Sequence, residues 1–380
     1  MVILTRKFQL FFLLFLLILL VGFLTFIPSG RLIVKTTLIV SEVIPNFPIK
    51  IQRFVTSSPI IEERVVETSI GKVKADLYRP NDGKKHPATV LTLGIVVTRK
   101  DSQLVKFAQA LSREGFVVLA ADLPDLTSGV VLNASIEGSV ELFEYLSAQD
   151  FVDTKRVGFT AFCAGGSIAI VASEDPRIRD QVLYINTLSP YFSLKELFRA
   201  AFTGQIIEKN GQTKKWQAEP QTKEAMVNGS LSYYQDEGER AILKAVALRE
   251  KQPTNEEIAS LSDEAMEAYN FYANNEPQRF DQLWEKLPQG AKELAASISP
   301  ETKIKDLKAK VFILSDLEDR FIPHTEGKKL AKALPENQVI YQEIDSLEHV
   351  RPSVRLSRLA ASKQVINLYI YLYKILKQIS

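Results

Sequence analysis

The chain has 380 residues, of which 46% are hydrophobic and 24% charged, so it is long enough to bury a sizeable core. Its formal net charge of +2 provides no strong positive field, and nucleic-acid binding is therefore not expected. One cysteine excludes an intramolecular disulfide, and one cysteine with three histidines makes a metal site built on these residues a poor expectation. We predict neither a metal nor a cofactor.

Residues 8–27 are almost wholly apolar, with Gln9 and Thr25 as the only clearly polar side chains. At 1.5 Å per residue this run is long enough to cross a hydrocarbon core of roughly 30 Å. Arg6 and Lys7 precede it, which favours a cytoplasmic amino terminus. We therefore predict a single-pass membrane anchor, with the main domain outside the cytoplasm.

A cleaved signal peptide is the alternative for this run. Its apolar region is normally shorter, about 7–15 residues, and ends at an A-x-A-like site that is not found here.

If residues 8–27 are an anchor, the segment 28–60 is a juxtamembrane region. Within it, residues 32–48 are apolar with scattered polar positions and could form a helix that lies on the lipid or packs on the domain.

Beyond residue 60, apolar strands alternate with amphipathic helices, which predicts an α/β fold: a mostly parallel sheet with helices on both faces. The predicted strands are 63–69 and 71–79 as a hairpin, then 88–93, 116–121, 156–161, 182–187, 310–314 and 338–344. The predicted helices are 103–114, 136–149 and a long one from about residue 354. The sheet domain is thereby divided into two parts, 61–190 and 306–380.

Residues 191–305 separate these parts and differ from them in composition and in periodicity. The stretch is rich in Glu, Lys, Gln and Ala, and it has helical spacing, for example at 194–202, 239–249 and 255–272. We predict a helical insertion. It is either a solvated decoration of the fold or a lid over a site at the sheet edge.

The single cysteine lies in an unusual context. A predicted strand ends at Ala161, Cys163 follows, and Gly165 and Gly166 lead into a predicted helix. This order is typical of a nucleophile elbow, where a nucleophile occupies a strained turn and the residues two before and two after it must be small. The dipole at the helix start would favour the thiolate. A merely buried cysteine remains the alternative, and Ser167 is the rival hydroxyl, although it lies inside the helix.

These residues resemble the dienelactone hydrolase family of α/β-hydrolases over about 93–170 and 311–349. The matching segments are FAQALSREGFVVLAAD (107–122), residues 152–157, and the run 162–166 around Cys163. The resemblance covers neither the apolar amino terminus nor the helical insertion. It implies a cysteine nucleophile with acid and histidine partners, acting on an ester-like bond such as that of a lactone.

The acid and the base are expected in that chain order after the nucleophile. Asp319 follows the strand 310–314 a few residues before a proline, where the resembling family places its acid, and Asp316 and Glu318 are its rivals. His349 follows the last strand, where the family places its base. His86 and His324 do not occupy such a position.

The oxyanion of the reaction would need two backbone donors, and we predict the N–H groups of Ala164 and Ile95. Two departures stand out: Ala161 replaces the usual glycine of the elbow, and the loop after strand 88–93 lacks the glutamate that assists thiol activation in the resembling family.

The leading hypothesis is a membrane-anchored hydrolase that cleaves a small-molecule ester, lactone or thioester through an acyl-cysteine intermediate. Two alternatives use the same fold: an acyltransferase on the same triad, and a non-catalytic binding protein at the membrane on a hydrolase scaffold.

Overall fold

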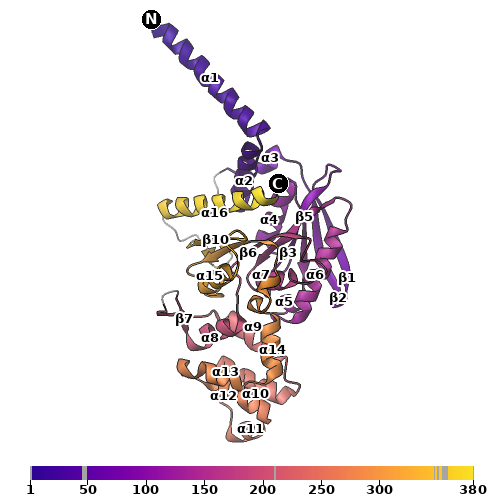
Figure 1. Cartoon of the computed structure of the whole chain (residues 1–380), viewed down its shortest axis with the longest axis vertical. Helices are drawn as coiled ribbons and strands as arrows, with labels where there is room; N and C mark the ends of the chain where they lie inside the picture. Colours follow the sequence, from indigo (N-terminus) through magenta and orange to yellow (C-terminus); the bar gives the residue numbers. More distant parts are fainter. Residues whose placement is uncertain are drawn as a thin grey trace.

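The computed structural model describes residues 2–44, 49–208, 211–345, 347–348, 351–352 and 358–379. Its centre is an eight-stranded sheet with the order β1-β2-β4-β3-β5-β6-β9-β10 (Figure 1). The hairpin of β1 (Ile60–Thr68) and β2 (Gly71–Arg79) is antiparallel, and β2 is antiparallel to β4. The remaining pairs are parallel. These strands are β3 (His86–Thr92), β4 (Val117–Asp122), β5 (Val152–Phe162), β6 (Val182–Leu188), β9 (Lys310–Asp316) and β10 (Val339–Ile344).

Every strand predicted for this sheet is present, with ends that differ by at most four residues. The largest difference is at β5, which begins at Val152 because this residue pairs with His86 of β3. A small separate pair, β11 (Leu347–Glu348) and β12 (Arg351–Pro352), follows β10 along the chain. The fold class predicted from the sequence is therefore confirmed.

Helices cover both faces of the sheet, as the apolar strands require. One face packs on α2 (Pro28–Val43), α4 (Ser102–Arg113) and α16 (Arg358–Ile379). The other face packs on α6 (Asn133–Ser147), α7 (Ala164–Ala172) and α15 (His324–Ala333). Strand β9 contributes side chains to both faces of the sheet. Val311 and Ile313 point to the α15 face, while Phe312 and Leu314 point to the α16 face.

The chain begins with α1 (Val2–Phe26), which extends away from the domain (Figure 1). Among the described residues, one helix segment, Phe8–Phe26, is long and apolar enough to cross a membrane, and none of it is buried against the rest of the chain. A membrane span and a signal sequence both have this form.

Pro28 begins α2 directly after α1, because the missing N–H of proline is not needed in the first turn of a helix. A helix is therefore present over part of the segment 32–48, and it packs on the domain: Ile39 is fully buried in the core shared with α4 and α16. The short helix α3 (Gln52–Val55) leads from there to the sheet.

The predicted insertion runs between β6 and β9 and is largely helical. Its elements are α8 (Leu194–Thr203), β7 (Gln205–Ile207), β8 (Thr213–Lys215), α9 (Pro220–Leu231), α10 (Glu237–Leu248), α11 (Asn255–Ala259), α12 (Asp263–Ala273), η1 (Pro277–Arg279), α13 (Phe280–Lys286), α14 (Gln289–Ser297), η2 (Pro300–Thr302) and η3 (Ile304–Asp306). The continuous helix predicted at 255–272 is two helices, because the side chain of Ser262 accepts the Ala265 N–H and starts α12 afresh. The β7–β8 hairpin was not predicted.

Buried polar contacts fix the insertion to the sheet domain where the chain enters it. The carboxylate of Glu326, at the start of α15, accepts the backbone N–H groups of Phe192 and Ser193 at 3.1 and 2.9 Å. The Ser193 hydroxyl donates to Glu301 at 2.6 Å, which joins the entry of the insertion to its exit. The insertion therefore has a defined base on the sheet domain.

Glu174, just beyond α7, is a buried acid with an expected effect on stability. Its side chain is 5% exposed, neither carboxylate oxygen has a hydrogen-bond partner among the described residues, and burial raises its pKa to about 8. The folded chain therefore holds a proton that the unfolded chain releases between about pH 4.5 and 8, so stability falls as the pH rises through this window.

Replacing Glu174 by Gln is expected to remove this pH dependence, since the amide stays neutral. Thermal unfolding at pH 6 and pH 8.5 measures it: the drop in stability should be smaller for Glu174→Gln, by about 1 kcal/mol or more. Glu144→Gln, at an exposed position of α6, is the matched control and should follow the unchanged protein. An equal drop in all three proteins would contradict the role of Glu174.

Candidate functional site

Cys163 occupies a strained turn between β5 and α7. Its φ and ψ are 55° and −136°, a region that non-glycine residues rarely adopt and that costs about 1–3 kcal/mol. The Cys163 N–H donates to the carbonyl of Leu188 at 2.8 Å, which ties the turn to the end of β6. This geometry is the one that the elbow pattern predicts.

Gly165 and Gly166 follow Cys163 because neighbouring atoms leave no room for a side chain at these positions, and not because of an unusual φ. A Cβ on Gly165 would lie 2.2 Å from the carbonyl oxygen of Leu93, and a Cβ on Gly166 would lie 1.9 Å from the Thr187 hydroxyl. Two residues before the cysteine, Ala161 is fully buried. Its methyl group is therefore accommodated where the elbow pattern usually has glycine.

The Cys163 side chain is 7% exposed and lines a pocket, and α7 begins at the next residue. The first N–H groups of that helix favour a negative charge at this position. The rival hydroxyl, Ser167, is fully buried and donates to the Tyr191 carbonyl at 2.8 Å. It belongs to the packing of α7 and does not line the pocket.

The loop after β3 passes directly over the cysteine. A Cβ on Gly94 would lie 3.0 Å from the Cβ of Cys163. Val96 has a positive φ of 52°, and its N–H donates to Leu126 of α5 (Pro124–Thr127) at 2.7 Å, which holds the loop in place. Ile95 of this loop and Ala164 both line the pocket. Neither of their N–H groups donates to a carbonyl among the described residues.

Asp319 lies on the turn after β9 and is 3% exposed. One of its carboxylate oxygens accepts the N–H groups of Phe321 and Ile322 at 2.7 and 3.0 Å. The rivals differ: Asp316 ends the strand and accepts the Glu318 N–H at 3.1 Å, and Glu318 itself is exposed. Phe321 and Ile322 line the same pocket as Cys163, so the turn of Asp319 borders it.

Residues of the helical insertion donate hydrogen bonds to the backbone carbonyls of this turn. The sequence analysis did not predict these contacts. The indole N–H of Trp216 donates to the Asp319 carbonyl at 2.7 Å. The Glu219 N–H donates to the Arg320 carbonyl at 2.8 Å, and the Thr222 hydroxyl to that of Phe321 at 3.2 Å. These residues are about a hundred positions apart in the chain, so no local pattern indicates the contacts.

His349, predicted as the base, lies outside the described residues. The described chain nonetheless leads toward this edge of the sheet: Ile344 ends β10, and its carbonyl accepts the Leu317 N–H at 2.8 Å. The other two histidines lie elsewhere. His86 contacts Asp82 at 2.7 Å, while His324 contacts Glu208 at 3.4 Å, and burial lowers the pKa of His324. Neither lines the pocket.

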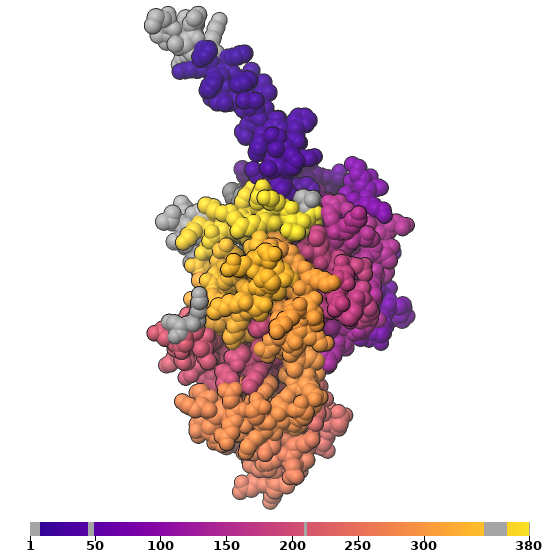
Figure 2. All heavy atoms as spheres, in the orientation of Figure 1, coloured from indigo at the N-terminus to yellow at the C-terminus, as the bar shows by residue number. Residues whose placement is uncertain are grey.

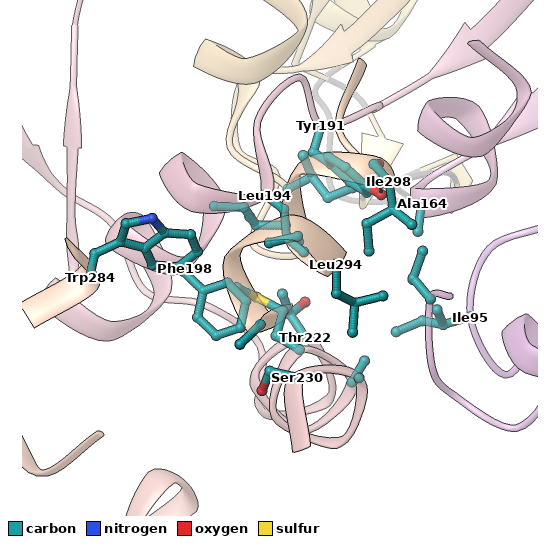
Figure 3. Close-up of a pocket in the computed structure, with 18 of the residues that line it drawn as sticks. Ile95, Ala164, Tyr191, Leu194, Phe198, Thr222, Ser230, Trp284, Leu294 and Ile298 are labelled. Atoms are coloured by element: carbon teal, nitrogen blue, oxygen red, sulfur yellow. Dashed lines mark hydrogen bonds between the residues drawn. The ribbon is translucent and has the colours of Figure 1, made fainter. Parts of the chain in front are cut away.

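The pocket above Cys163 lies between the sheet edge and the insertion and has an internal volume of about 70 Å³, with further space where it opens to solvent. Figure 3 shows Ala164 and Ile95 on one side of it and Phe198 and Trp284 on the opposite side. None of the described lining residues is charged. No group of His, Cys, Asp or Glu that could hold a metal is found in the described part of the chain.

A scan against known protein families and a search of curated proteins both find no match. Solved structures are similar in fold at low identity. A 2,6-dihydroxy-pseudo-oxynicotine hydrolase is 11% identical, with a TM-score of 0.50 over 84% of this chain and 68% of its own. Est1E from Butyrivibrio proteoclasticus is 14% identical, with a TM-score of 0.48 over 85% and 99%. An esterase from the archaeon Pyrobaculum calidifontis is 14% identical, with a TM-score of 0.44 over 92% and 90%.

Identities this low show a common fold and say nothing about a common reaction. The strand order, the parallel pairing from β4 to β10 and the turn between β5 and α7 agree with that fold. The chain has the α/β-hydrolase fold, with a helical insertion between β6 and β9 and an apolar helix at its amino terminus.

Proposed function

We propose that this protein is a hydrolase of the dienelactone hydrolase type, which cleaves an ester, lactone or thioester through an acyl-cysteine intermediate on Cys163. The observation that carries the proposal is the strained turn at Cys163. A non-glycine residue with φ 55° is costly, and here it presents a thiol to a pocket at a helix amino terminus. A cysteine that served only packing would not require this backbone.

The proposed reaction has two halves. His349 takes the thiol proton, and the Cys163 sulfur attacks the carbonyl carbon of the substrate. The bond to the leaving group breaks as His349 returns the proton to that group. Water then attacks the acyl-cysteine, His349 takes its proton, and the acid is released as the proton returns to the thiolate. Asp319 stabilises the charged imidazole throughout.

The N–H groups of Ala164 and Ile95 are the proposed donors to the oxyanion. Both residues line the pocket beside Cys163, and neither N–H is used by a carbonyl of the described chain. The proposal for His349 rests on chain length: it lies five positions beyond Ile344, with four residues between them, a reach of at most about 18 Å. That is more than the three strand spacings, roughly 14 Å in all, from β10 to β5.

Transfer of the acyl group to an alcohol or amine is a second candidate. The burial of Cys163 beneath the insertion favours it, since a lid that excludes water lets another acceptor compete. Product analysis with added alcohols distinguishes the two: the free acid indicates hydrolysis, and a new ester indicates transfer.

We also propose that α1 anchors the protein in a membrane, with the domain outside the cytoplasm. The apolar segment Phe8–Phe26 and the basic residues before it support this topology. Resistance of the protein to carbonate extraction, with the domain accessible to protease from outside spheroplasts or the corresponding compartment, is the expected result. Release of a shortened chain lacking α1 would instead show a cleaved signal.

The hydrolase proposal is tested on the full-length protein in detergent. A short-chain p-nitrophenyl ester is supplied with and without iodoacetamide, and the label is located by mass spectrometry. The assay is unambiguous, because Cys163 is the sole cysteine of the chain. We expect turnover to be lost in proportion to labelling. Absence of turnover, with a thiol no more reactive than free cysteine, would favour a binding protein on this scaffold.

A further inference from the structure

The lining of the pocket above Cys163 identifies a class of substrate. We infer, resting on the proposed acyl-cysteine chemistry, that the acyl group is an apolar chain of medium length, which extends from Cys163 into the helical insertion. The hydrolase proposal requires only a carbonyl at the cysteine and leaves this group undefined.

The part of the pocket inside the insertion is apolar and aromatic. Phe198 of α8 and Phe271 of α12 lie with ring centroids 5.8 Å from that of Trp284, and all three line the pocket. Leu294 of α14 and Met226 of α9 complete this wall. Such a surface gains free energy by removing methylene groups from water and offers nothing to an ionised ligand.

Hydroxyl groups in the lining are mostly committed to the protein. Thr222 donates to the Phe321 carbonyl, Tyr191 donates to the Ile298 carbonyl at 2.8 Å, and Ser230 and Tyr272 contact each other at 2.5 Å. Tyr234 is the exception: it is buried, and its hydroxyl has no partner among the described residues. The pocket therefore accepts an apolar chain and leaves a place for one oxygen substituent along it.

The two sides of the pocket give the chain a direction. Ala164 and Ile95, the proposed oxyanion donors, lie opposite Phe198 and Trp284 (Figure 3). A substrate carbonyl at Cys163 therefore directs its acyl chain toward the aromatic wall. The leaving group is then directed to the opposite side, toward the loop of Ile95.

The insertion lies at the end of the molecule opposite α1 (Figures 1 and 2). If α1 spans a membrane, the pocket is held away from that bilayer by the depth of the sheet domain. A lipid embedded in the same bilayer is therefore not placed beside Cys163. The geometry favours an acyl donor that reaches the site through water, as a soluble or micellar monoacyl ester or thioester.

Chain-length selectivity tests the inference on the full-length protein in nanodiscs. The kcat/KM values for p-nitrophenyl acetate and octanoate are compared, and octanoate should be preferred at least about tenfold, since each buried methylene contributes to binding. A phospholipid with octanoyl chains in the nanodisc itself should be cleaved far more slowly than the soluble octanoate ester. Equal rates on acetate and octanoate would overturn the inference and leave the hydrolase proposal intact.

A matched pair of variants on α14 tests whether the preference for octanoate arises in this pocket. Ala291 lines the pocket, so Ala291→Trp should lower the octanoate-to-acetate ratio at least about tenfold. Ala296 is exposed on another face of the same helix and does not line the pocket, so Ala296→Trp should keep the ratio. An unchanged ratio in Ala291→Trp would contradict the proposed path of the chain.

The affinity of the pocket for a fatty acid can be measured without any turnover and without the Ala291 variant. Cys163→Ser in nanodiscs is titrated with dansyl-undecanoic acid, and octanoate is used as the competitor. Saturable binding that octanoate displaces and acetate does not is the expected result. No saturable binding would overturn the inference. If no ester of any length is cleaved and Cys163 is never acylated, it is the hydrolase proposal that fails.

Discussion

Replacing Cys163 by Ala is expected to abolish turnover of every ester substrate while leaving the fold intact. Alanine fits this site, where the buried side chain of Cys163 packs beneath the Gly94 loop. Loss of a nucleophile that acts together with its base costs at least about 1,000-fold in kcat. Steady-state kinetics on a p-nitrophenyl ester, with thermal unfolding as the check on folding, measures the effect.

Ser167→Ala is the control for this prediction, because Ser167 is the nearby rival hydroxyl and its role is a hydrogen bond to the Tyr191 carbonyl. It should lose some stability, about 1 kcal/mol, and retain turnover. Full activity of Cys163→Ala, or an inactive but folded Ser167→Ala, would contradict the assignment of the nucleophile.

The second large effect is expected at Asp319. Substitution by Asn leaves an oxygen to accept the Phe321 and Ile322 N–H groups but removes the charge that the imidazole of His349 requires. We expect kcat to fall on the order of 100-fold or more, with little change in the melting temperature. The pH–rate profile should change as well, because the charge that favours the protonated base is lost.

Glu318→Gln and Asp316→Asn separate the proposed acid from its neighbours on the same turn. Glu318 is exposed, so its substitution should leave both activity and stability unchanged. Asp316 is buried at the end of β9 and holds the Glu318 N–H, so its substitution should lower stability before it affects kcat. A greater loss of kcat in either control than in Asp319→Asn would move the acid to that residue.

Local periodicity was enough to predict the sheet. The strand around Val311 and Leu314 is apolar at every position because helices cover both faces, and that continuous run is visible in the sequence. The elbow was predictable for a related reason. Its demand for small residues is local, so Ala161, Gly165 and Gly166 mark the turn before any tertiary contact is known.

Contacts between distant segments could not be predicted in this way. Trp216 holds the carbonyl of Asp319, and Glu326 fixes the entry of the insertion at Phe192; both contacts span about a hundred residues or more and follow from packing alone. The break before α12 was missed because the capping serine, Ser262, lies within an otherwise regular helical pattern. The apolar pocket likewise appears only when residues of several insertion helices converge.

The most direct test of the central claim is the capture of the acyl-enzyme. The full-length protein is mixed with p-nitrophenyl octanoate, quenched in acid within the first turnover, digested and analysed by mass spectrometry. We expect an octanoyl group on the peptide that contains Cys163, absent in Cys163→Ala and removed by neutral hydroxylamine, which cleaves thioesters. An octanoyl group on a serine, or turnover with no acylated peptide under these conditions, would contradict a cysteine hydrolase.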